Sequence, residues 1–296
     1  MPPSPPKTIL ITGCSAQGIG AALAQQPAQE GHVLFATART PSKIPAELRE
    51  QANVHVLALD VTEAASIAAA VHSVTEHTST SGNHRGLDVL INNAGTGYTM
   101  PLAEADLERA RAVYEANVWG PLQLIQAFQP LLVAARGRIV NLSSVGAVVP
   151  TPWIGVYASS KAALVQLSET LRLELQPFGV GVVCVMAGTV ATAFHANEPE
   201  VRLPPASRYA PIRRIIADWA TGRAGPRNAS SPDDFAKALV EDVVLAETLP
   251  AGLVWKGPNS AAVRLLARWC PVGLLDRIMK NGQGLDELTE SLEGKK

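Results

Sequence analysis

The sequence predicts an α/β fold in which helices cover both faces of a parallel sheet. From Lys7 onward, short runs rich in Val, Ile and Leu alternate with longer segments of helical spacing. The short runs lack alternating polar residues, which is typical of strands that are buried on both faces. The 296 residues are 47% hydrophobic, so they can form a large core. Because α/β folds of roughly 250 residues often form one domain, we expect a single domain.

Six strands are expected in order along the chain, with helices between them. The strands are Thr8–Thr12, His32–Ala36, Val54–Leu59, Val89–Asn92, Arg138–Leu142 and Val180–Val185. The helices are Ile19–Gln29, Glu63–His77, Leu107–Ala134, about Lys161–Gln176, and Phe235–Ala246. Pro27 is expected to disturb the later turns of the first helix. The last helix follows Ser231-Pro232-Asp233-Asp234, a favourable start with a capping hydroxyl, a proline and two acids.

Four segments depart from this alternation. Residues 1–6 are expected to be a disordered tail, and Thr78–Arg85 a polar loop. Within a catalytic domain spanning 7–256, the stretch 193–231 interrupts the pattern, and we expect it to form a lid. Residues 257–296 are expected to form a C-terminal helical extension. Pro271 and Gly273 there predict two short helical pieces within Ser260–Asn281.

Composition excludes several classes of protein. With 25 Lys and Arg against 26 Asp and Glu, the net charge of −1 gives no overall attraction to nucleic acid. Cys14, Cys184 and Cys270 are odd in number and lack CxxC spacing, which argues against a disulfide framework or a metal site and favours a reducing, cytoplasmic location. Two long uncharged stretches, Ile139–Ser160 and Leu175–Asn197, contain proline or glycine and are not expected to span a membrane.

The first strand leads directly into a glycine turn, Thr12–Gly20, after which helical spacing begins. Glycines allow a tight turn and a close approach to a pyrophosphate, and the free amides of a new helix stabilise its charge. This is the order of a Rossmann dinucleotide-binding unit; the alternative is a tight turn without a ligand. The candidate cofactor-binding residues of this turn are Gly13, Ser15, Gln17, Gly18, Ile19 and Gly20.

The end of the second strand indicates which dinucleotide binds. An acid usually holds the adenosine ribose at this position, yet none occurs from His32 to Thr40. Arg39 offers instead a planar guanidinium suited to a ribose 2′-phosphate. The sequence therefore favours NADP(H) over NAD(H), unless Arg39 is an ordinary exposed loop arginine.

Tyr157 and Lys161, in the run YASSK, follow Ser144 by thirteen and seventeen residues. On a helix the i,i+4 spacing places both side chains on one face, where the ammonium can favour the phenolate. A tyrosine acting near neutral pH needs its pKa lowered from about 10 by about two to three units. The alternative for an isolated YxxxK is a solvated helix face, but its position after the fifth strand favours chemistry.

These motifs together resemble the short-chain dehydrogenase/reductase family of the single-domain type, over about residues 7–246. TGCSAQGIG, NNAG at Asn92–Gly95, Asn117 in NVWG, and Ser144 with YASSK agree in order and spacing. The resemblance implies that Tyr157 is the proton donor and acceptor and that Ser144 hydrogen-bonds the reacting oxygen. It further implies that Lys161 binds the nicotinamide ribose and that Asn117 holds a relay water. Ser143 is the competing serine.

The resemblance also implies further cofactor contacts. Asp60 and Val61 correspond to the adenine-contacting pair, and Asn93, Ala94 and Gly95 lie along the cofactor. After the sixth strand the family usually has Pro-Gly, whereas this chain has Ala187-Gly188. We therefore expect a less rigid loop that still binds nicotinamide. The residues concerned are Gly188, Val190 and Thr192.

The resemblance implies an NADPH-dependent carbonyl reductase or alcohol dehydrogenase acting on a small molecule, as a homo-oligomer. ATAR, GPLQLIQAFQPLL, Cys270-Pro271 and Leu285-Asp286 resemble the fungal branch that contains 1-acyldihydroxyacetone-phosphate reductases and enzymes of secondary metabolism, which implies an apolar or lipid-like carbonyl substrate. The alternatives are a catalytically silent NADP(H)-binding sensor or scaffold, and a nucleotide-sugar epimerase or dehydratase. The extension either closes the substrate pocket or makes peripheral membrane contact through apolar residues flanked by basic ones. Those basic residues are Arg264, Arg268, Arg277 and Lys280.

Overall fold

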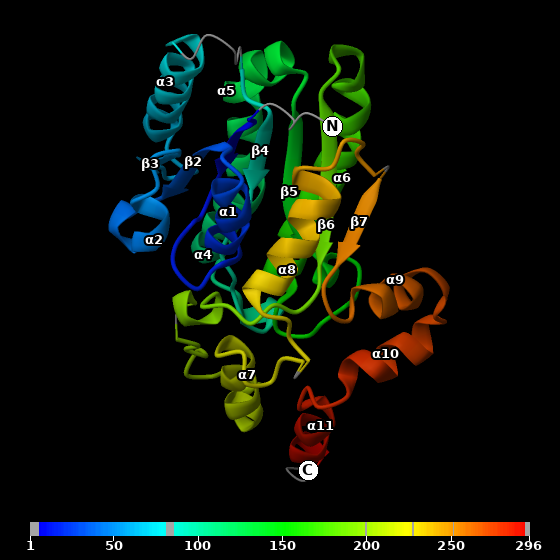
Figure 1. Ribbon diagram of the computed structural model, residues 1–296. Coiled ribbons are helices and arrows are strands. Elements are labelled where there is room, and N and C mark those ends of the chain that lie inside the picture. The colour runs from blue at the N-terminus through cyan, green and yellow to red at the C-terminus, as the bar shows by residue number, and fades with distance from the viewer. Residues whose placement is uncertain (1–5, 81–85, 199, 227, 251, 294–296) are drawn as a thin grey trace.

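A seven-stranded parallel sheet forms the centre of the computed structural model, which describes residues 6–80, 86–198, 200–226, 228–250 and 252–293 (Figure 1). The strand order is β3-β2-β1-β4-β5-β6-β7. The strands are β1 (Thr8–Ile11), β2 (Val33–Ala38), β3 (Val54–Ala58), β4 (Val89–Asn92), β5 (Arg138–Ser144), β6 (Gly181–Ala187) and β7 (Leu253–Lys256). The predicted Rossmann sheet in a single domain is therefore confirmed, with one strand more than expected.

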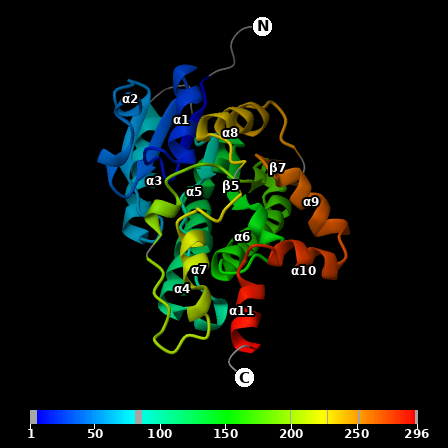
Figure 2. The same ribbon diagram turned by 90° about the horizontal axis from the view of Figure 1, so that it is seen from below.

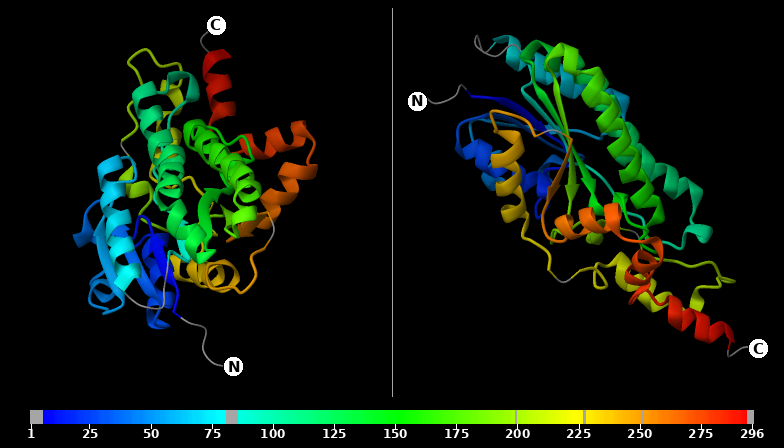
Figure 3. Two further views of the ribbon diagram at one scale, coloured as in Figure 1. Left: turned by 90° about the horizontal axis from the view of Figure 1, so that it is seen from above. Right: turned by 90° about the vertical axis from the view of Figure 1, so that its right-hand side faces the viewer.

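Helices cover both faces of this sheet, as Figure 3 shows edge-on. In β1, the buried side chains of Ile9 and Ile11 belong to the core that includes Leu23 of α1 and Leu239 of α8. Leu10, between them, points the other way and belongs to the core under α3 and α5. The bounds are α1 (Ile19–Gln29), α3 (Ala64–Thr80), α5 (Gly120–Ala135), α6 (Gly155–Glu174) and α8 (Pro232–Leu239).

The C-terminal extension folds as short helices at the end of the molecule where the strands end (Figures 1 and 2). The two predicted pieces are confirmed as α9 (Ser260–Trp269) and α10 (Val272–Lys280), separated at Pro271. A third helix, α11 (Leu285–Glu293), was not predicted. Among its described residues, the stretch 193–231 contains the α-helix α7 (Arg213–Ala220) and two 3-10 turns, His195–Asn197 and Ala210–Ile212. A single α-helical turn, α2 (Ala46–Arg49), lies between β2 and β3. Among the described helices, none is long and apolar enough to cross a membrane.

Several predicted boundaries were wrong. Helix α3, which was expected to end at His77, continues to Thr80, so the first residues of the expected loop are helical. Positions 81–85 of that loop lie outside the described residues. Pro27 lies inside α1, and the helix nevertheless continues to Gln29. The expected helix Leu107–Ala134 is divided: α4 (Leu107–Tyr114) passes through a π-helical turn, Glu115–Trp119, before α5 begins.

Candidate active site

The predicted site residues gather at the carboxyl end of the sheet. The strand order reverses between β1 and β4, and ligands of parallel α/β sheets bind in the crevice at that point. Each strand from β1 to β6 ends beside predicted residues. Gly13 to Gly20 follow β1, Arg39 follows β2, and Asp60 with Val61 follow β3. Asn93 to Gly95 follow β4, Ser144 ends β5, and Gly188 to Thr192 follow β6.

The glycine turn after β1 has the form of a phosphate cradle. Gly13 has φ +75°, and a Cβ there would lie 3.0 Å from Cα of Ala94. A Cβ on Gly20 would lie 2.5 Å from the carbonyl oxygen of Gly13, so neither position accepts a larger residue. Helix α1 begins after Gly18 with no side-chain cap and no acid in its first turn, which leaves its positive end open to an anion. The turn therefore fits a pyrophosphate.

The turn after β4 is bonded to the glycine turn. The hydroxyl of Thr12 accepts hydrogen bonds from the amides of Asn93 (3.0 Å) and Ala94 (2.9 Å). The Asn93 side-chain amide donates to the carbonyl of Thr12 at 2.8 Å. The two loops thus form one rigid unit on both sides of the strand-order reversal.

The loop after β6 is held firmly despite its missing proline. The amide of Gly188 donates to the carbonyl of Lys256 at 2.8 Å, and that of Ala191 to the carbonyl of Ser230 at 2.9 Å. The amide of Ala193 donates to Gln17 of the glycine turn at 3.3 Å. Backbone hydrogen bonds to neighbouring segments thus anchor the loop where the family has a proline, and its expected lower rigidity stays a prediction. Val190 and Thr192 lie within this anchored segment and are half-buried.

Arg39 and Asp60 lie at the ends of β2 and β3. Arg39 is exposed, and its side chain makes no hydrogen bond or ion pair with any residue that the structure describes. The Asp60 carboxylate accepts hydrogen bonds from the amide and hydroxyl of Thr62, at 3.0 and 2.8 Å, while Val61 is buried. Arg39 is consequently available to an anion, whereas Asp60 already has donors.

Tyr157 and Lys161 lie on one face of α6. The Lys161 ammonium is 5.9 Å from the centre of the Tyr157 ring and donates to the carbonyl of Leu142 at 2.8 Å. The Ser144 hydroxyl, at the end of β5, lies close enough to the Tyr157 hydroxyl to favour its ionised form. Three of the predicted catalytic groups are thus adjacent.

The electrostatics of this pair differ from the expectation. Burial raises the pKa of Tyr157; the hydrogen bond to Ser144 partly opposes this, and the Glu198 carboxylate raises it further. Burial lowers the pKa of Lys161 from 10.5 to about 8. The lowered tyrosine pKa expected from the sequence is therefore not found in the protein alone, because burial outweighs the opposing contact with Ser144.

Asn117, the fourth predicted catalytic residue, lies in the π-helical turn and is fully buried. Its side-chain oxygen accepts from the amide of Thr96 at 2.9 Å, and its nitrogen donates to the carbonyl of Thr96 (2.9 Å) and the hydroxyl of Ser160 (3.0 Å). A Cβ on Gly95 would lie 2.9 Å from the Asn117 oxygen and 3.4 Å from the Lys161 nitrogen. Asn117 and Lys161 therefore both border Gly95. A π-turn at this position agrees with the frequent occurrence of such turns at functional sites.

The two adjacent serines at the end of β5 face different surroundings. Ser143 is 4% exposed, and its hydroxyl donates to the carbonyl of Lys161 at 3.0 Å. Ser144 accepts from the amide of Gly146 at 3.1 Å and contacts Tyr157. The geometry favours Ser144 for chemistry and Ser143 for holding α6 against the strand.

We expect Ser144→Ala to lower kcat by about a hundredfold, as for loss of a donor to a developing oxyanion. Ser143→Ala is the matched control: it should lower kcat only slightly but cost about 1 kcal/mol of stability, because it removes a buried hydrogen bond. Steady-state kinetics and urea unfolding of both variants test this. A larger loss of kcat in a stably folded Ser143→Ala would show that the wrong serine was chosen.

Two further residues at the site were not predicted. Phe194 packs against the Tyr157 ring with centres 5.7 Å apart. The Glu198 side chain is only 4% exposed; it accepts from the hydroxyl of Thr99 at 2.8 Å and lies 3.3 Å from Nδ1 of His195. Both belong to the lid stretch, whose sequence carries no motif that would single them out. They bring that stretch directly over the tyrosine.

Comparison with known proteins agrees with this geometry. A family model described as "short chain dehydrogenase" matches residues 7–202. The chain is 42% identical to Short-chain dehydrogenase PC-15 of Penicillium crustosum over 275 residues, 93% of this chain and 95% of that protein.

Solved structures with the same fold bind either dinucleotide. A short-chain dehydrogenase from Burkholderia cenocepacia in complex with NADP aligns with a TM-score of 0.71 and 24% identity, covering 93% of this chain and 97% of that one. A short-chain dehydrogenase/reductase from Burkholderia phymatum in complex with NAD aligns with a TM-score of 0.71 and 26% identity, covering 88% and 92%. The family consists of oxidoreductases that use nicotinamide cofactors. On the matched model, the relative and the assembled site, the chain belongs to the short-chain dehydrogenase/reductase family.

Proposed function

We propose that the protein is an NADPH-dependent carbonyl reductase, and in reverse an alcohol dehydrogenase acting on CH–OH groups. The observation that carries this proposal is the half-buried Tyr157 phenol, beside Ser144 and on the same helix face as Lys161, at the end of the sheet that holds the glycine cradle. No other arrangement of titratable groups among the described residues combines a proton donor with an adjacent dinucleotide crevice.

In this proposal each side chain has a defined role. NADPH, when bound, supplies the hydride for the carbonyl carbon. Tyr157 donates its proton to the carbonyl oxygen, and Ser144 stabilises the charge that develops there. The Tyr157 phenol, whose pKa burial raises, is protonated at neutral pH, as a proton donor must be. Lys161 and Asn117 border Gly95 and hold the nicotinamide ribose and the relay water in their proposed roles.

The preference for NADPH depends on Arg39. A bidentate contact to a 2′-phosphate easily supplies the roughly 1.4 kcal/mol that a tenfold preference requires. We therefore expect kcat/KM with NADPH to exceed that with NADH at least tenfold, and Arg39→Asp to abolish or reverse the preference. Kinetics with both cofactors test this, with Arg109→Asp, an exposed arginine on α4, as the control. Equal use of both cofactors by the natural chain would contradict the assignment.

The lid stretch supports an apolar or lipid-like substrate. Trp153, Ile212 and Ile216 are buried together, with Leu203 and Tyr209 half-buried against them. Phe194 adds a ring beside Tyr157. Incubation of the enzyme and NADPH with a panel of ketones and aldehydes, followed by mass spectrometry of the alcohols formed, identifies the substrate class. A panel in which only short polar carbonyls react would overturn this part of the proposal.

Two alternative functions differ from the proposed reductase in how they would bind and consume NADPH. A silent NADP(H)-binding sensor or scaffold would bind NADPH without oxidising it in the presence of any carbonyl. A nucleotide-sugar epimerase or dehydratase would act on nucleotide sugars with no net consumption of NADPH. The intact set of Ser144, Tyr157, Lys161 and Asn117 favours the reductase over the first, and the spacing of the glycines between Gly13 and Gly20, which differs from the spacing usual in such epimerases, favours it over the second.

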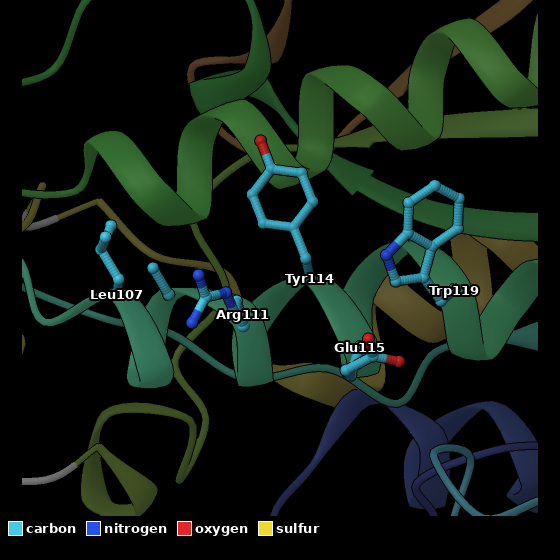
Figure 4. Close-up of a pocket in the computed structure, with 6 residues that line it drawn as sticks. Leu107, Arg111, Tyr114, Glu115 and Trp119 are labelled. Atoms are coloured by element: carbon cyan, nitrogen blue, oxygen red, sulfur yellow. The ribbon is translucent and has the colours of Figure 1, made fainter.

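Self-association and location are further parts of the proposal. The outer side of α4 and the π-turn exposes Leu107 (67%) and Trp119 (44%) around a groove of about 280 Å³, with Tyr114 pointing toward the neighbouring helix α6 (Figure 4). An apolar groove of this kind supports a homo-oligomer, which light scattering of the purified chain would reveal. The free cysteines Cys14 and Cys184, both buried, support a cytoplasmic location, and tagging of the chain in cells tests it.

A further inference from the structure

Helices α9 and α10 carry large apolar side chains that the described chain leaves uncovered. Trp269 and Val272, where α9 ends and α10 begins, are 73% and 74% exposed. Leu265 is 62% exposed, Leu274 51% and Ile278 43%. We call these five residues the docking face. A group of large apolar side chains with this exposure indicates a site of contact with another protein or with a membrane.

Positive charge accompanies this face. The stretch Ser260–Asn281 holds four basic residues and one acid, Asp276, a net charge of +3; because the whole chain carries −1, the remainder carries −4. The four basic side chains are exposed, and none forms an ion pair with a described residue. In α9, Arg264 and Arg268 form an i,i+4 row directly beside the row of Leu265 and Trp269. Basic and apolar rows thus run side by side.

The face is held in a fixed place on the body. At one end, Ser260 is buried and its hydroxyl donates to the carbonyl of Gly257 at 2.7 Å. At the other end, the indole of Trp153 donates to the carbonyl of Gln283 at 3.1 Å, and Leu285 packs against the apolar cluster of the lid. The two helices between these anchors project from the body (Figures 1 and 2). The anchored residues pack against the body, whereas the five apolar side chains of α9 and α10 remain uncovered by described residues.

The charge pattern decides among partners. A second copy related by a two-fold axis would bring two stretches of +3 against each other, which is unfavourable. An uncharged apolar partner would leave the basic row without a role. An anionic bilayer satisfies both rows, because apolar side chains enter the acyl boundary while Arg and Lys remain among the headgroups.

We propose that α9 and α10 dock on the surface of an anionic lipid bilayer, with the docking face at the boundary between headgroups and acyl chains. Since α9 contacts the turn after β5 that follows Ser144, docking holds the substrate side of the active site close to the membrane. A substrate that partitions into lipid would then be collected at the surface. The docking itself does not depend on the proposed reaction, so a chain that docks without reducing any carbonyl leaves this inference standing.

Vesicle flotation of the full chain at low salt tests the proposal. We expect the chain to float with phosphatidylcholine vesicles containing about one-third phosphatidylserine, to bind pure phosphatidylcholine at least tenfold more weakly, and to be released by salt. The double substitution Trp269→Ser with Val272→Ser should weaken binding at least tenfold. Arg264→Gln with Arg268→Gln should also weaken it, and mainly for anionic vesicles.

Phe178→Ser is the matched control, since Phe178 is 52% exposed but lies outside the extension; it should bind vesicles like the natural chain. Circular dichroism and NADPH binding verify that each variant is folded. A natural chain that stays free of both kinds of vesicle overturns the proposal. If light scattering also shows that the natural chain is a dimer and that the double variant Trp269→Ser with Val272→Ser is a monomer, the docking face is instead a contact between two copies of the chain. Equal flotation of the natural chain and the serine variant also overturns it.

Discussion

Replacing Tyr157 by Phe should reduce kcat at least a hundredfold while leaving the Kd for NADPH within a few-fold of the natural value. The substitution removes only the phenolic oxygen, which supplies the proton, and retains the ring that packs against Phe194. Proton transfer by a positioned side chain contributes about a hundred- to ten-thousandfold to rates. Steady-state kinetics and fluorescence titration with NADPH measure the two quantities separately.

Tyr114→Phe is the matched control, because Tyr114 lies in the α4 groove and takes no part in the site. It should leave both kcat and Kd unchanged. A Tyr157→Phe variant that keeps a tenth or more of the natural kcat would show that another group donates the proton.

Replacing Lys161 by Met should damage both cofactor binding and turnover. We expect at least a tenfold rise in the Kd for NADPH and at least a hundredfold loss of kcat, because Lys161 borders Gly95 and lies near Tyr157. Lys161 is 6% exposed, and burying its ammonium has a cost, since its pKa falls from 10.5 to about 8. That difference corresponds to roughly 3 kcal/mol. The protein without cofactor should therefore not lose stability on substitution, and we expect a gain of about 1 kcal/mol at pH 7 once the lost bond to Leu142 is deducted.

The gain should depend on pH in a defined direction. The folded chain releases the lysine proton near pH 8 and the unfolded chain near 10.5, so between these values the unfolded chain binds more protons. The natural chain then becomes more stable as the pH rises, and the advantage of Lys161→Met shrinks over the same range. Urea unfolding at pH 7 and pH 9.5 measures this, with Lys237→Met, an exposed lysine of α8, as the control. A variant clearly less stable than the natural chain at pH 7 would contradict the cost assigned to burial.

The glycine turn and the sheet could be predicted because their signals are local. Strand β1, the turn and helix α1 are consecutive in sequence, so the glycines at 13 and 20 already predict a turn in which backbone segments pack closely against each other. The i,i+4 spacing of Tyr157 and Lys161 is likewise a property of one helix. Residues at the ends of successive parallel strands meet at one edge, which explains why the distant predicted positions came together.

The remaining features depend on contacts between distant parts of the chain. Glu198 and Phe194 lie at the site because the stretch 193–231 brings them against Thr99 and Tyr157, and no hydrophobic periodicity in the sequence predicts those contacts. Strand β7 has four residues and is fixed by pairing with β6. The division of the long helix at Asn117 follows from the side-chain bonds to Thr96 and Ser160, which lie far away in sequence. The raised pKa of Tyr157 reflects burial, which spacing alone does not reveal.

The most direct test of the central claim is transfer of deuterium from NADPH labelled at the reactive carbon of its nicotinamide. The natural enzyme, the labelled cofactor and a panel of apolar ketones are incubated together, and the products are examined by mass spectrometry. The proposal predicts an alcohol with one deuterium on the former carbonyl carbon, formed by the natural chain and by Tyr114→Phe, and at least a hundredfold more slowly by Tyr157→Phe. Tight binding of NADPH by a folded natural chain that yields no labelled alcohol from any carbonyl would contradict it and identify a silent cofactor-binding protein instead.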